Sequence, residues 1–546
     1  MGFQIYICLV PNGLSFIFSR NNTFLMAFLS AGYWGFCILL AISCFACPAW
    51  AGQAVSGHTP DRFDVRDYGA TGDGLHLDSP AINQAIAAAA GTGGGTVYVP
   101  AGTYLCGSIH LQSNIHLEVE AGATILGAPQ SMGAYDETEP YDLGGFQDGG
   151  HCYFHNSLIW GENLTNVFIT GQGMINGGGM VASDKILDRM CGFNQNHPST
   201  NPGKLPPVRL GNKAIALKLS RNVLIRDVTI FHGGHFAILV TGCDDLTVDN
   251  VTMDTDRDGI DIDCCRNTMV SNCRINSPND DGLCPKSTFV LGRIQPTENL
   301  TIVNCQVSGF KEGTLLDGTE QPSKGHNGRI KFGTESSGGF RNCTVSNCTF
   351  RDCRGLALEE VDGALMSDIT INNLTMLNVY DYAIYITTGE RNRTPNLQTS
   401  SRGRNILISN VIADKVGAMS GIQIMGLPAQ PVQGVRLSNI QLISCGGGTQ
   451  ADAGRQPEEL GVGYPEPRRL GTMPAYGIYA RHAEDLELSD IHLSFETDDA
   501  RPAAMFTDVQ GLDMDHIVAQ TTTGVPPVKM GAGVDQVTIR NSPGIP

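Results

Sequence analysis

Short segments in which hydrophobic and polar residues alternate recur along most of the chain, and Asn or Asp stands where each segment bends. Alternation with a period of two residues is typical of half-buried β-strands. From Asn222 to Asp245 and then to Asn267, the repeat advances by 23 and then by 22 residues. The repeats begin with NIHLEVEAGATIL (114), NVFITGQGMI (166), NVLIRDVTI (222), DLTVDNVTM (245), NTMVSNCRI (267) and NLTIVNCQV (299), and continue with FRNCTVSNCTF (340), DITINNLTM (368), NILISNVIA (405), GVRLSNIQL (434), DLELSDIHL (485), GLDMDHIVA (511) and DQVTIRN (535).

A nearly fixed period of short β-units predicts an all-β solenoid, a single-stranded, right-handed parallel β-helix. No single coil can bury its own hydrophobic face, so the array is expected to fold as one domain. A β-propeller is the alternative, but its blades need about 40–45 residues. Before the repeats, Asp78-Ser79-Pro80 is predicted to cap a short helix over 81–90, which would cover the N-terminal end of the solenoid.

Three longer segments interrupt the repeat, at 127–155, 179–207 and 446–474. The first two are rich in Gly, Asn and Pro, and the third contains the sequence YPEPRR. Loops that leave one side of a solenoid usually build its binding face. We therefore expect these inserts to line the functional site.

The N-terminal region has the features of a secretory signal. The segment 38–50 is apolar and is followed by an Ala49-Trp50-Ala51 cleavage pattern. We predict a signal peptide over 1–51, with Met26 as a possible true start, and a β-helix domain over 52–546. The alternative is an uncleaved anchor. The prediction implies an exported protein, periplasmic or extracellular, that is free of the membrane after cleavage.

Composition narrows the function classes. The net charge is -18 and no Lys/Arg run is present, which argues against nucleic-acid binding. A polyanionic substrate would have to be met by local basic groups. Of 17 Cys, four lie in the leader, and the spacing of the others does not fit a zinc site. They are expected either to form disulfides or to fill the core as small buried side chains. A monomer is expected.

Three aspartates about one repeat apart are the strongest candidates for chemistry. Asp258 lies in TDRDGIDI, and the adjacent Asp280 and Asp281 follow in SPNDDG. If successive coils stack these positions, the three carboxylates share one patch. Like charges brought so close do not all stay ionised, so the pKa of one carboxyl should rise. A protonated carboxyl beside an ionised one is the pair that glycoside hydrolysis requires.

Together with GTESSGGFRN at 333–342, these motifs resemble glycoside hydrolase family 28, the polygalacturonases and rhamnogalacturonan hydrolases, from residue 63 onward. The resemblance implies a pectin-lyase-like β-helix, a pectic polysaccharide or oligosaccharide substrate, and inverting hydrolysis without a metal or cofactor. Carried over by position, Asp281 is the general acid, and Asp258 and Asp280 activate water. In an inverting enzyme, carboxyl groups about 6.5–9.5 Å apart leave room for that water.

Two positions depart from the family pattern. Aligned on Gly333-Thr334-Glu335, Asn327 stands where the family has His, and His326 precedes it. The family's Arg-Ile-Lys motif, which holds the uronate carboxylate beyond the scissile bond, is replaced by Ala357-Leu358-Glu359. Glu359 would repel a uronate at that subsite, whereas neutral rhamnose would be accepted. The sequence therefore favours the alternating galacturonate–rhamnose backbone of pectin as the substrate.

Other candidate substrate ligands are Arg329, Lys331, His235 and Arg481. The Arg329-Ile330-Lys331 string stands one coil too early for the family motif, but both cations would share one strand face. That face would either bind a carboxylate or lie in solvent. Arg481 and the aromatic YPEP segment would either close one end of the binding site, which favours exo attack, or form an ordinary strand and surface loop.

Three other functions stay open. One is a plain polygalacturonase acting on homogalacturonan. Another is a calcium-dependent pectate lyase, which needs a cation site and a basic residue to abstract a proton; the sequence shows no obvious Arg or Lys at the matching depth. The third is a non-catalytic carbohydrate-binding β-helix or adhesin, which would need no patch of three carboxylates.

Overall fold

The computed structural model describes residues 62–194, 205–397 and 399–545, together with the backbone of three N-terminal strands. The chain forms two compact units, 1–59 and 60–546. In the first, β1 (Gln4–Val10), β2 (Gly13–Arg20) and β3 (Thr23–Phe24) form an antiparallel sheet. The predicted cleavage region at 38–51 lies outside the described residues. Among those described, no helix is long and apolar enough to cross a membrane.

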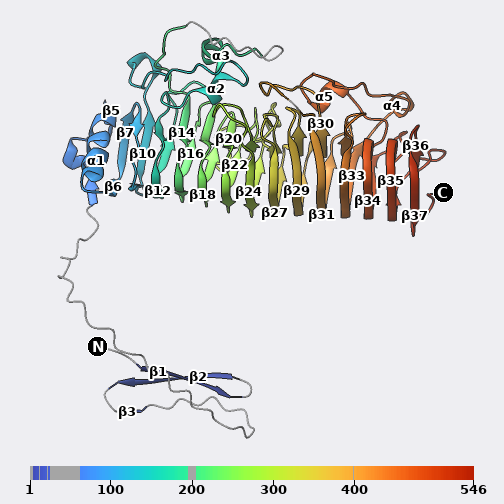
Figure 1. Ribbon diagram of the computed structural model, residues 1–546, viewed down its shortest axis with the longest axis horizontal. Helices are drawn as coiled ribbons and strands as arrows, with labels where there is room; N and C mark the ends of the chain where they lie inside the picture. The colour runs from blue at the N-terminus through green and yellow to red at the C-terminus, as the bar shows by residue number, and fades with distance from the viewer. Residues whose placement is uncertain are drawn as a thin grey trace. The chain divides into compact units, whose positions relative to one another are not determined.

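The second unit is a right-handed parallel β-helix, as the sequence predicts (Figure 1). In its middle, each coil contributes three strands, and every strand pairs in parallel with its counterpart on the next coil. Ile238 pairs with Ile260, and Met253 pairs with Ile275, each a step of 22 residues. The spacing read from the repeats is therefore the length of one coil.

One face of the solenoid is made by a sheet whose strands are β8 (Ile109–His110), β11 (Ile159–Glu162), β14 (Lys213–Lys218), β17 (Phe236–Thr241), β20 (Asp258–Asp263) and β23 (Leu283–Lys286). A bridge between Leu283 and Ile330 continues this face. It then runs through β26 (Lys331–Phe332), β28 (Arg354–Glu360), β30 (Tyr380–Thr388), β32 (Ile422–Met425) and the first residues of β34 (Ile478–Thr497).

The other strands complete the coils. They are β4 (Arg62–Asp64), β5 (Asp73–Leu77), β6 (Gly95–Val99), β7 (Gly102–Cys106), β9 (Ile115–Val119), β10 (Ala123–Gly127), β12 (Thr165–Gly171), β13 (Met174–Asn176), β15 (Arg221–Arg226), β16 (Thr229–Phe231), β18 (Asp244–Asp249), β19 (Thr252–Asp254), β21 (Arg266–Ser271), β22 (Arg274–Asn276), β24 (Thr297–Val303), β25 (Gln306–Ser308), β27 (Phe340–Arg351), β29 (Leu365–Leu377), β31 (Arg402–Val416), β33 (Val432–Gly446), β35 (Ala504–Ala519), β36 (Val528–Met530) and β37 (Asp535–Arg540).

The core is a continuous column of aliphatic side chains inside the coils. Ile215, Ile238, Ile260, Leu283 and Ile330 follow one another along the site-bearing face, all fully buried. The thirteen cysteines of the described residues carry free thiols, and twelve of them are buried. Of the two roles predicted for cysteine, the structure therefore shows the small buried filler.

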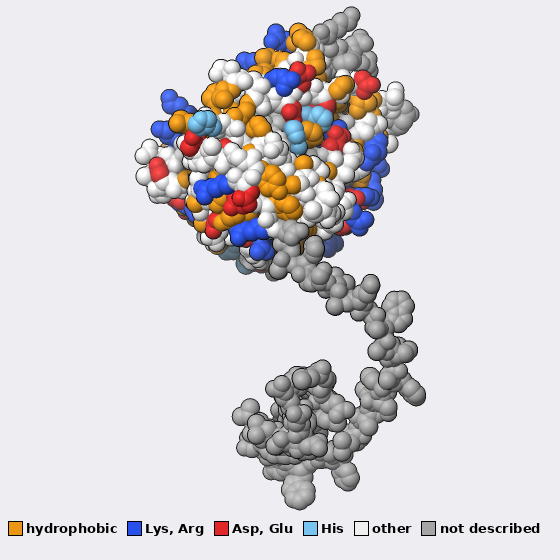
Figure 2. Space-filling view, turned by 90° about the vertical axis from the view of Figure 1, so that its left-hand side faces the viewer, with side chains coloured by type: hydrophobic (Ala, Val, Ile, Leu, Met, Phe, Trp, Pro, Cys, Tyr) orange, Lys and Arg blue, Asp and Glu red, His pale blue; other side chains and the backbone are white. Residues whose placement is uncertain are grey.

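A helix covers the N-terminal end, where the first coil would otherwise expose its core. This helix, α1 (Ser79–Gly91), buries Ile82, Ala85, Ile86 and Ala89 against the solenoid. Asp78 precedes it but does not cap it with its side chain. Its carboxylate instead accepts hydrogen bonds from the Thr71 and Gly72 amides. Figure 2 looks onto this end, where hydrophobic, acidic and basic side chains are interspersed.

The predicted inserts lie along one long side of the β-helix (Figure 1). The first two carry α2 (Gly149–Cys152) and α3 (Lys185–Cys191), which pack together through Cys152, Leu187 and Met190. The third carries α4 (Gln450–Ala453) and α5 (Pro467–Leu470). Two short 3-10 helices, Val65–Tyr68 and Gln130–Met132, complete the helical elements of the described residues.

The bends between strands form a ladder of asparagine side chains. Asn347 donates to the Asn304 side-chain oxygen at 3.2 Å and accepts from the Asn373 amide at 3.0 Å. All three have positive φ, near 55°. This left-handed conformation is unfavourable for most residues but is tolerated by Asn. The recurrent Asn therefore sets the bend and links successive coils.

Replacing Asn347 separates these two contributions. We expect Asn347→Ala to lower the free energy of unfolding by about 2 kcal/mol, from the lost hydrogen bonds and the left-handed backbone together. Asn347→Gly loses the hydrogen bonds alone and should cost about 1 kcal/mol. Denaturant unfolding of the two variants checks this; equal losses would show that the backbone conformation contributes nothing.

Candidate active site

The parallel register brings the three predicted catalytic aspartates together. Ile260 of β20 pairs with Leu283 of β23, and Asp258 and Asp281 stand two residues before them. The intervening glycine allows this stacking, because a Cβ on Gly259 would lie 2.3 Å from the Gly282 carbonyl oxygen. One carboxylate oxygen from each of Asp258, Asp280 and Asp281 lies within 4.8 Å of the others.

Asp281 is buried and held by two cations from the next coil. Arg329 Nε donates to its Oδ1 at 2.7 Å, and Lys331 Nζ donates to its Oδ2 at 2.6 Å. Burial disfavours the carboxylate, but Lys331 and Arg329 outweigh it and hold the pKa of Asp281 well below its usual value. Asp281 is therefore ionised, which differs from the raised pKa expected of a general acid.

The raised pKa belongs to Asp258 instead. Burial, followed by the negative charges of Asp280 and Asp261, lifts the pKa of Asp258 well above its usual value. Asp280 is the most accessible of the three, with 26% of its side chain exposed, and it pairs with Arg257 Nη2 at 2.5 Å. The cluster therefore combines one carboxyl with a raised pKa, Asp258, and one with a lowered pKa, Asp281, so the raised pKa lies on a different residue from the predicted general acid.

The spacing of the carboxyls is closer than the sequence-based expectation. The nearest oxygens lie within 4.8 Å, against about 6.5–9.5 Å between carboxyl groups in inverting glycosidases. This limit joins one oxygen of each residue and so does not by itself choose between inversion and retention. The stereochemical course accordingly remains a prediction.

A second buried charge network, missed by the sequence reasoning, adjoins Asp258. Lys286 Nζ lies 3.0 Å from Asp261, 3.1 Å from the His151 ring and 3.5 Å from Glu335. Asp261 and Lys286 face outward on β20 and β23, but the first insert covers them. Their burial depends on His151 of this insert. Because the path of an insert does not follow the repeat, the burial of these charges could not be predicted from the sequence.

The third insert reaches the same site from the other side. Tyr464 lies with its hydroxyl 3.5 Å from Lys331 Nζ, and Glu466 accepts a hydrogen bond from Arg354 at 3.0 Å. Glu466 also lies 3.9 Å from Arg329. The prediction that YPEP comes to the binding site agrees with these contacts.

Ala357-Leu358-Glu359 lies where the alignment expects it, one coil beyond Arg329-Ile330-Lys331. Lys331 pairs with Ala357 in the sheet. Glu359 is almost fully buried, and burial raises its pKa to about 7 even though Lys331 and Arg329 favour the ionised form. Arg329 and Lys331, predicted either to bind a carboxylate or to lie in solvent, are buried on the carboxylate of Asp281.

His326 and Asn327 stand apart from the carboxylates. The His326 ring stacks on Tyr380 with centroids 3.7 Å apart. Asn327 donates from its side chain to the Asn279 carbonyl at 3.0 Å. The described structure thus gives both residues a role in holding the chain beside the Asp280 turn, and it shows no contact between them and the three carboxylates.

His235 and Arg481 are also engaged elsewhere. His235 is buried, and its Nδ1 lies 2.9 Å from the Ala182 carbonyl. Arg481 donates to the carbonyls of Pro457 and Glu458 at 2.6 and 2.8 Å. Its guanidinium therefore anchors the third insert, and the prediction that it meets a terminal substrate carboxylate does not agree with this geometry.

Within the described part of the chain, three groups of side chains have the spacing to hold a cation: Asp258, Asp280 and Asp281; Asp258, Asp261 and Cys284; and Asp148, Asp184 and His235. Protein cations already stand beside the first two, since Lys331 contacts Asp281 and Lys286 contacts Asp261. The donor sets of these two groups are therefore those of internal ion pairs.

The expectation that no base lies near the acidic cluster is wrong in its geometry. Lys286 and Lys331 are both there. Burial favours their neutral forms, but Asp261 and Asp281 respectively raise their pKa values well above the ordinary one. A lysine must be neutral to abstract a proton. The ion pairs therefore argue against a lyase on different grounds from those of the sequence.

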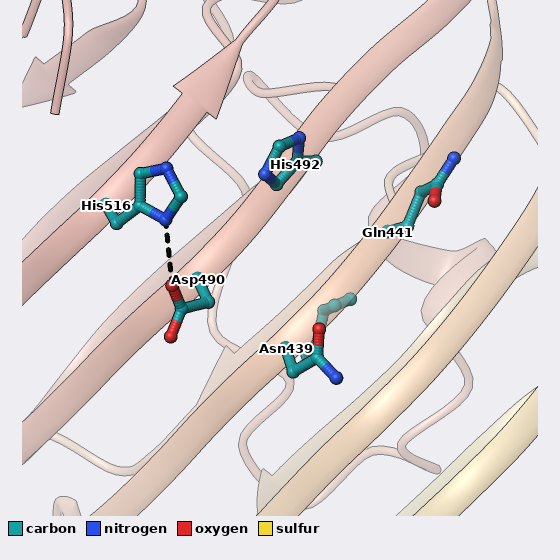
Figure 3. Close-up of a pocket in the computed structure, with 6 residues that line it drawn as sticks. Asn439, Gln441, Asp490, His492 and His516 are labelled. Atoms are coloured by element: carbon teal, nitrogen blue, oxygen red, sulfur yellow. Dashed lines mark hydrogen bonds and ion pairs between the residues drawn. The ribbon is translucent and has the colours of Figure 1, made fainter.

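A hollow of about 330 Å³ lies on the outer surface of β33, β34 and β35 (Figure 3). Asp490 and His516 form an ion pair of 2.8 Å on its wall. Its other lining residues are Asn439, Ile440, Gln441 and His492. None of these is a residue of the carboxylate cluster.

Comparisons with known proteins agree with the β-helix fold. Residues 62–284 match the family described as Rhamnogalacturonase A/epimerase, pectate lyase-like, and residues 213–396 match the right-handed β-helix region. A probable polygalacturonase of Vitis vinifera is 24% identical over 394 residues, which are 69% of this chain and 73% of the relative.

Two further similarities are to a solved structure and to a binding protein. The structure of the Yersinia enterocolitica family 28 exopolygalacturonase covers 83% of this chain and 78% of its own with a TM-score of 0.59 and 18% identity. The plasmin and fibronectin-binding protein A of Streptococcus pneumoniae is 36% identical over 193 residues, 34% of this chain and 23% of that protein. The resemblance to the polygalacturonases of glycoside hydrolase family 28 is confirmed.

The ion pairs of Asp281 make the stability of the fold depend on pH. Because its pKa is below the usual value of about 4, the stabilisation is present above that pH and is lost as the pH falls through the folded-state pKa. We expect Asp281→Asn to lower the free energy of unfolding by about 3–5 kcal/mol at pH 7, since it leaves two buried cations unpaired.

The difference between wild type and Asp281→Asn should narrow below about pH 4, as measured by urea unfolding from pH 7 downward. Asp280→Asn is the control, because its partly exposed pair should contribute at most about 1 kcal/mol. A difference that stays constant across this range would contradict the low pKa.

Proposed function

We propose that this protein, similar in sequence and fold to the polygalacturonases, is a pectin-degrading glycoside hydrolase that cleaves galacturonosyl linkages. The observation that carries the proposal is the meeting of three carboxyls within 4.8 Å of one another, two of which have pKa values shifted in opposite directions. Asp258 favours the protonated form, whereas Lys331 and Arg329 keep Asp281 ionised. Acid and base in one patch are what glycoside hydrolysis needs.

The geometry changes the roles assigned by resemblance alone. We assign the donated proton to the Asp258–Asp280 pair, in which Asp280 is the accessible member. This proton passes to the glycosidic oxygen as the bond to the anomeric carbon breaks. A water molecule attacks that carbon and passes its proton to Asp281, whose fixed negative charge also stabilises the positive sugar ring. The fixed cations Arg329 and Lys331 orient the Asp281 carboxylate for this step.

Substrate preference follows from the second coil beyond Asp281, which carries Ala357 and Glu359. The cationic pair that would hold a uronate there is replaced by Ala357 and Glu359, and the nearby cations are already paired with Asp281. This supports the rhamnose-containing backbone as substrate. Tyr464 and Glu466 of the third insert bound the site on its C-terminal side, which supports exo attack.

Two other functions have specific support. The Vitis vinifera and Yersinia enterocolitica relatives are named as acting on polygalacturonate, which favours the plain polygalacturonase. The similarity to the Streptococcus pneumoniae binding protein favours a non-catalytic β-helix. We further propose that the protein is exported after loss of 1–51 and that it acts as a monomer.

Product analysis distinguishes these functions. We expect purified protein to release galacturonate from rhamnogalacturonan oligosaccharides, with slower release from polygalacturonate, and Asp280→Asn to reduce turnover of both by about 10²–10⁴-fold. Faster cleavage of polygalacturonate would keep the hydrolase and reject the rhamnose preference. An unsaturated product that absorbs ultraviolet light and disappears with chelator would indicate a lyase. Binding without turnover would indicate the non-catalytic protein.

Aryl galacturonides test which carboxyl carries the proton. A nitrophenolate leaves without protonation, so a variant that lacks the acid keeps more activity on this substrate than on oligosaccharides. We expect this selective retention in Asp280→Asn or Asp258→Asn. Asp281→Asn should lose both activities by about 10²-fold or more, with partial recovery in azide. Selective retention in Asp281→Asn would restore Asp281 as the acid. The anomer first formed, measured by NMR, decides between inversion and retention.

A further inference from the structure

Buried polar atoms without hydrogen-bond partners gather beside the carboxylate cluster, beneath the third insert. They are Glu359 Oε2, Glu466 Oε1, the Tyr385 hydroxyl and both amide atoms of Gln423. Ala357, Tyr385 and Gln423 pair in register on three successive coils, β28, β30 and β32. Glu359 and Glu466 both lie close enough to Tyr385 to raise the pKa of its hydroxyl, to which burial contributes most.

These side chains point out of the solenoid. Their neighbours along the strands, Leu358, Ile384, Ile386, Ile422 and Ile424, all belong to the interior core. Alternation therefore directs Ala357, Tyr385 and Gln423 to the outer face. There, Leu470 and Met473 of the third insert pack on Tyr382, Tyr385 and Tyr479.

The energetic cost of this arrangement calls for an explanation. Each buried polar group without a partner costs about 1–3 kcal/mol, and native proteins keep few of them. Here five such atoms are concentrated on one insert and on the first, second and third coils beyond the Lys331 that contacts Asp281. Polar atoms that form no hydrogen bonds within the protein are suited to form hydrogen bonds with a ligand.

The chemistry of the pocket matches a neutral sugar. A hydroxyl, an amide and a carboxyl supply donors and acceptors for sugar hydroxyls. The rings of Tyr382 and Tyr385, with centroids 5.5 Å apart, offer apolar surface to the carbon face of a sugar. Two acidic side chains disfavour a uronate. Ala357 places only a methyl group between Lys331 and Tyr385 in the register of the sheet.

We propose that Glu359, Tyr385 and Gln423 form a specificity pocket that binds the neutral sugar adjacent to the galacturonate being released. The inference rests on the proposed hydrolase function and names the residues that select its substrate. Because the insert covers these atoms in the free protein, the sugar gains access when the insert moves. This movement would break the Tyr464–Lys331 and Glu466–Arg354 contacts.

Tyr385→Phe and Gln423→Met test the pocket, since each removes unpartnered polar atoms with little change of shape. We expect each to raise KM for rhamnogalacturonan oligosaccharides about tenfold, the effect of one lost hydrogen bond. Thermal stability should stay equal or rise, because no hydrogen bond within the protein is lost. Ser157→Ala, which removes a buried unpartnered hydroxyl from the coil of β11, is the matched control and should leave KM unchanged.

Calorimetry with a rhamnogalacturonan tetrasaccharide gives a readout independent of turnover, in the Asp280→Asn background. About tenfold weaker binding by the double variants Asp280→Asn/Tyr385→Phe and Asp280→Asn/Gln423→Met supports the pocket. Unchanged KM and unchanged affinity in both would overturn it and indicate that the atoms hold water. If wild type turns over neither polymer, the hydrolase proposal fails, while calorimetry still decides whether the pocket binds sugar.

Discussion

The buried ion pairs of Asp281 with Arg329 and Lys331 are the interaction on which the rest of the site depends. Two cations beside one carboxylate fix its charge and its orientation, and the raised pKa of the cluster lies on Asp258 instead. The same pairing removes Arg329 and Lys331 from direct contact with a substrate carboxylate. In the proposed enzyme, one interaction therefore shapes both the acid–base chemistry and the charge preference of the neighbouring subsite.

The pairing also ties the third insert to the catalytic coils. From Asp281, charges alternate in sign through Arg329 and Glu466 to Arg354, and Arg354 lies 3.1 Å from Asp381. Arg468 of the third insert forms an ion pair with Asp381 at 2.7 Å. Each charge in this series of ion pairs is balanced by the next. A displacement of the third insert would therefore alter the contacts of the carboxylate cluster.

The periodicity of the sequence was sufficient to predict the fold. Each coil repeats the same alternation of hydrophobic and polar residues and the same bend, as Asn347 illustrates. It also placed Asp258 and Asp281 on adjacent coils. The protonation pattern was not accessible, since it depends on Arg329 lying beside Asp281 at a distance of 48 residues. His151 lies in the first insert, and the carbonyls that Arg481 contacts lie in the third. Inserts carry no period, so these contacts could not be derived from the spacing of the repeats.

The residues of the site come from two separate parts of the sequence. Asp258, Asp280 and Asp281 are complete by residue 281, whereas Tyr464 and Glu466 come from a segment inserted more than 150 residues later. Coils of a solenoid contact only their neighbours, so the early ones can stack before the late ones exist. The proposed acid–base residues and the insert that bounds the site thus lie in separate stretches of the sequence. Changes of length within 446–474 would alter the C-terminal boundary of the proposed site while leaving the sequence of the coils that carry the aspartates unchanged.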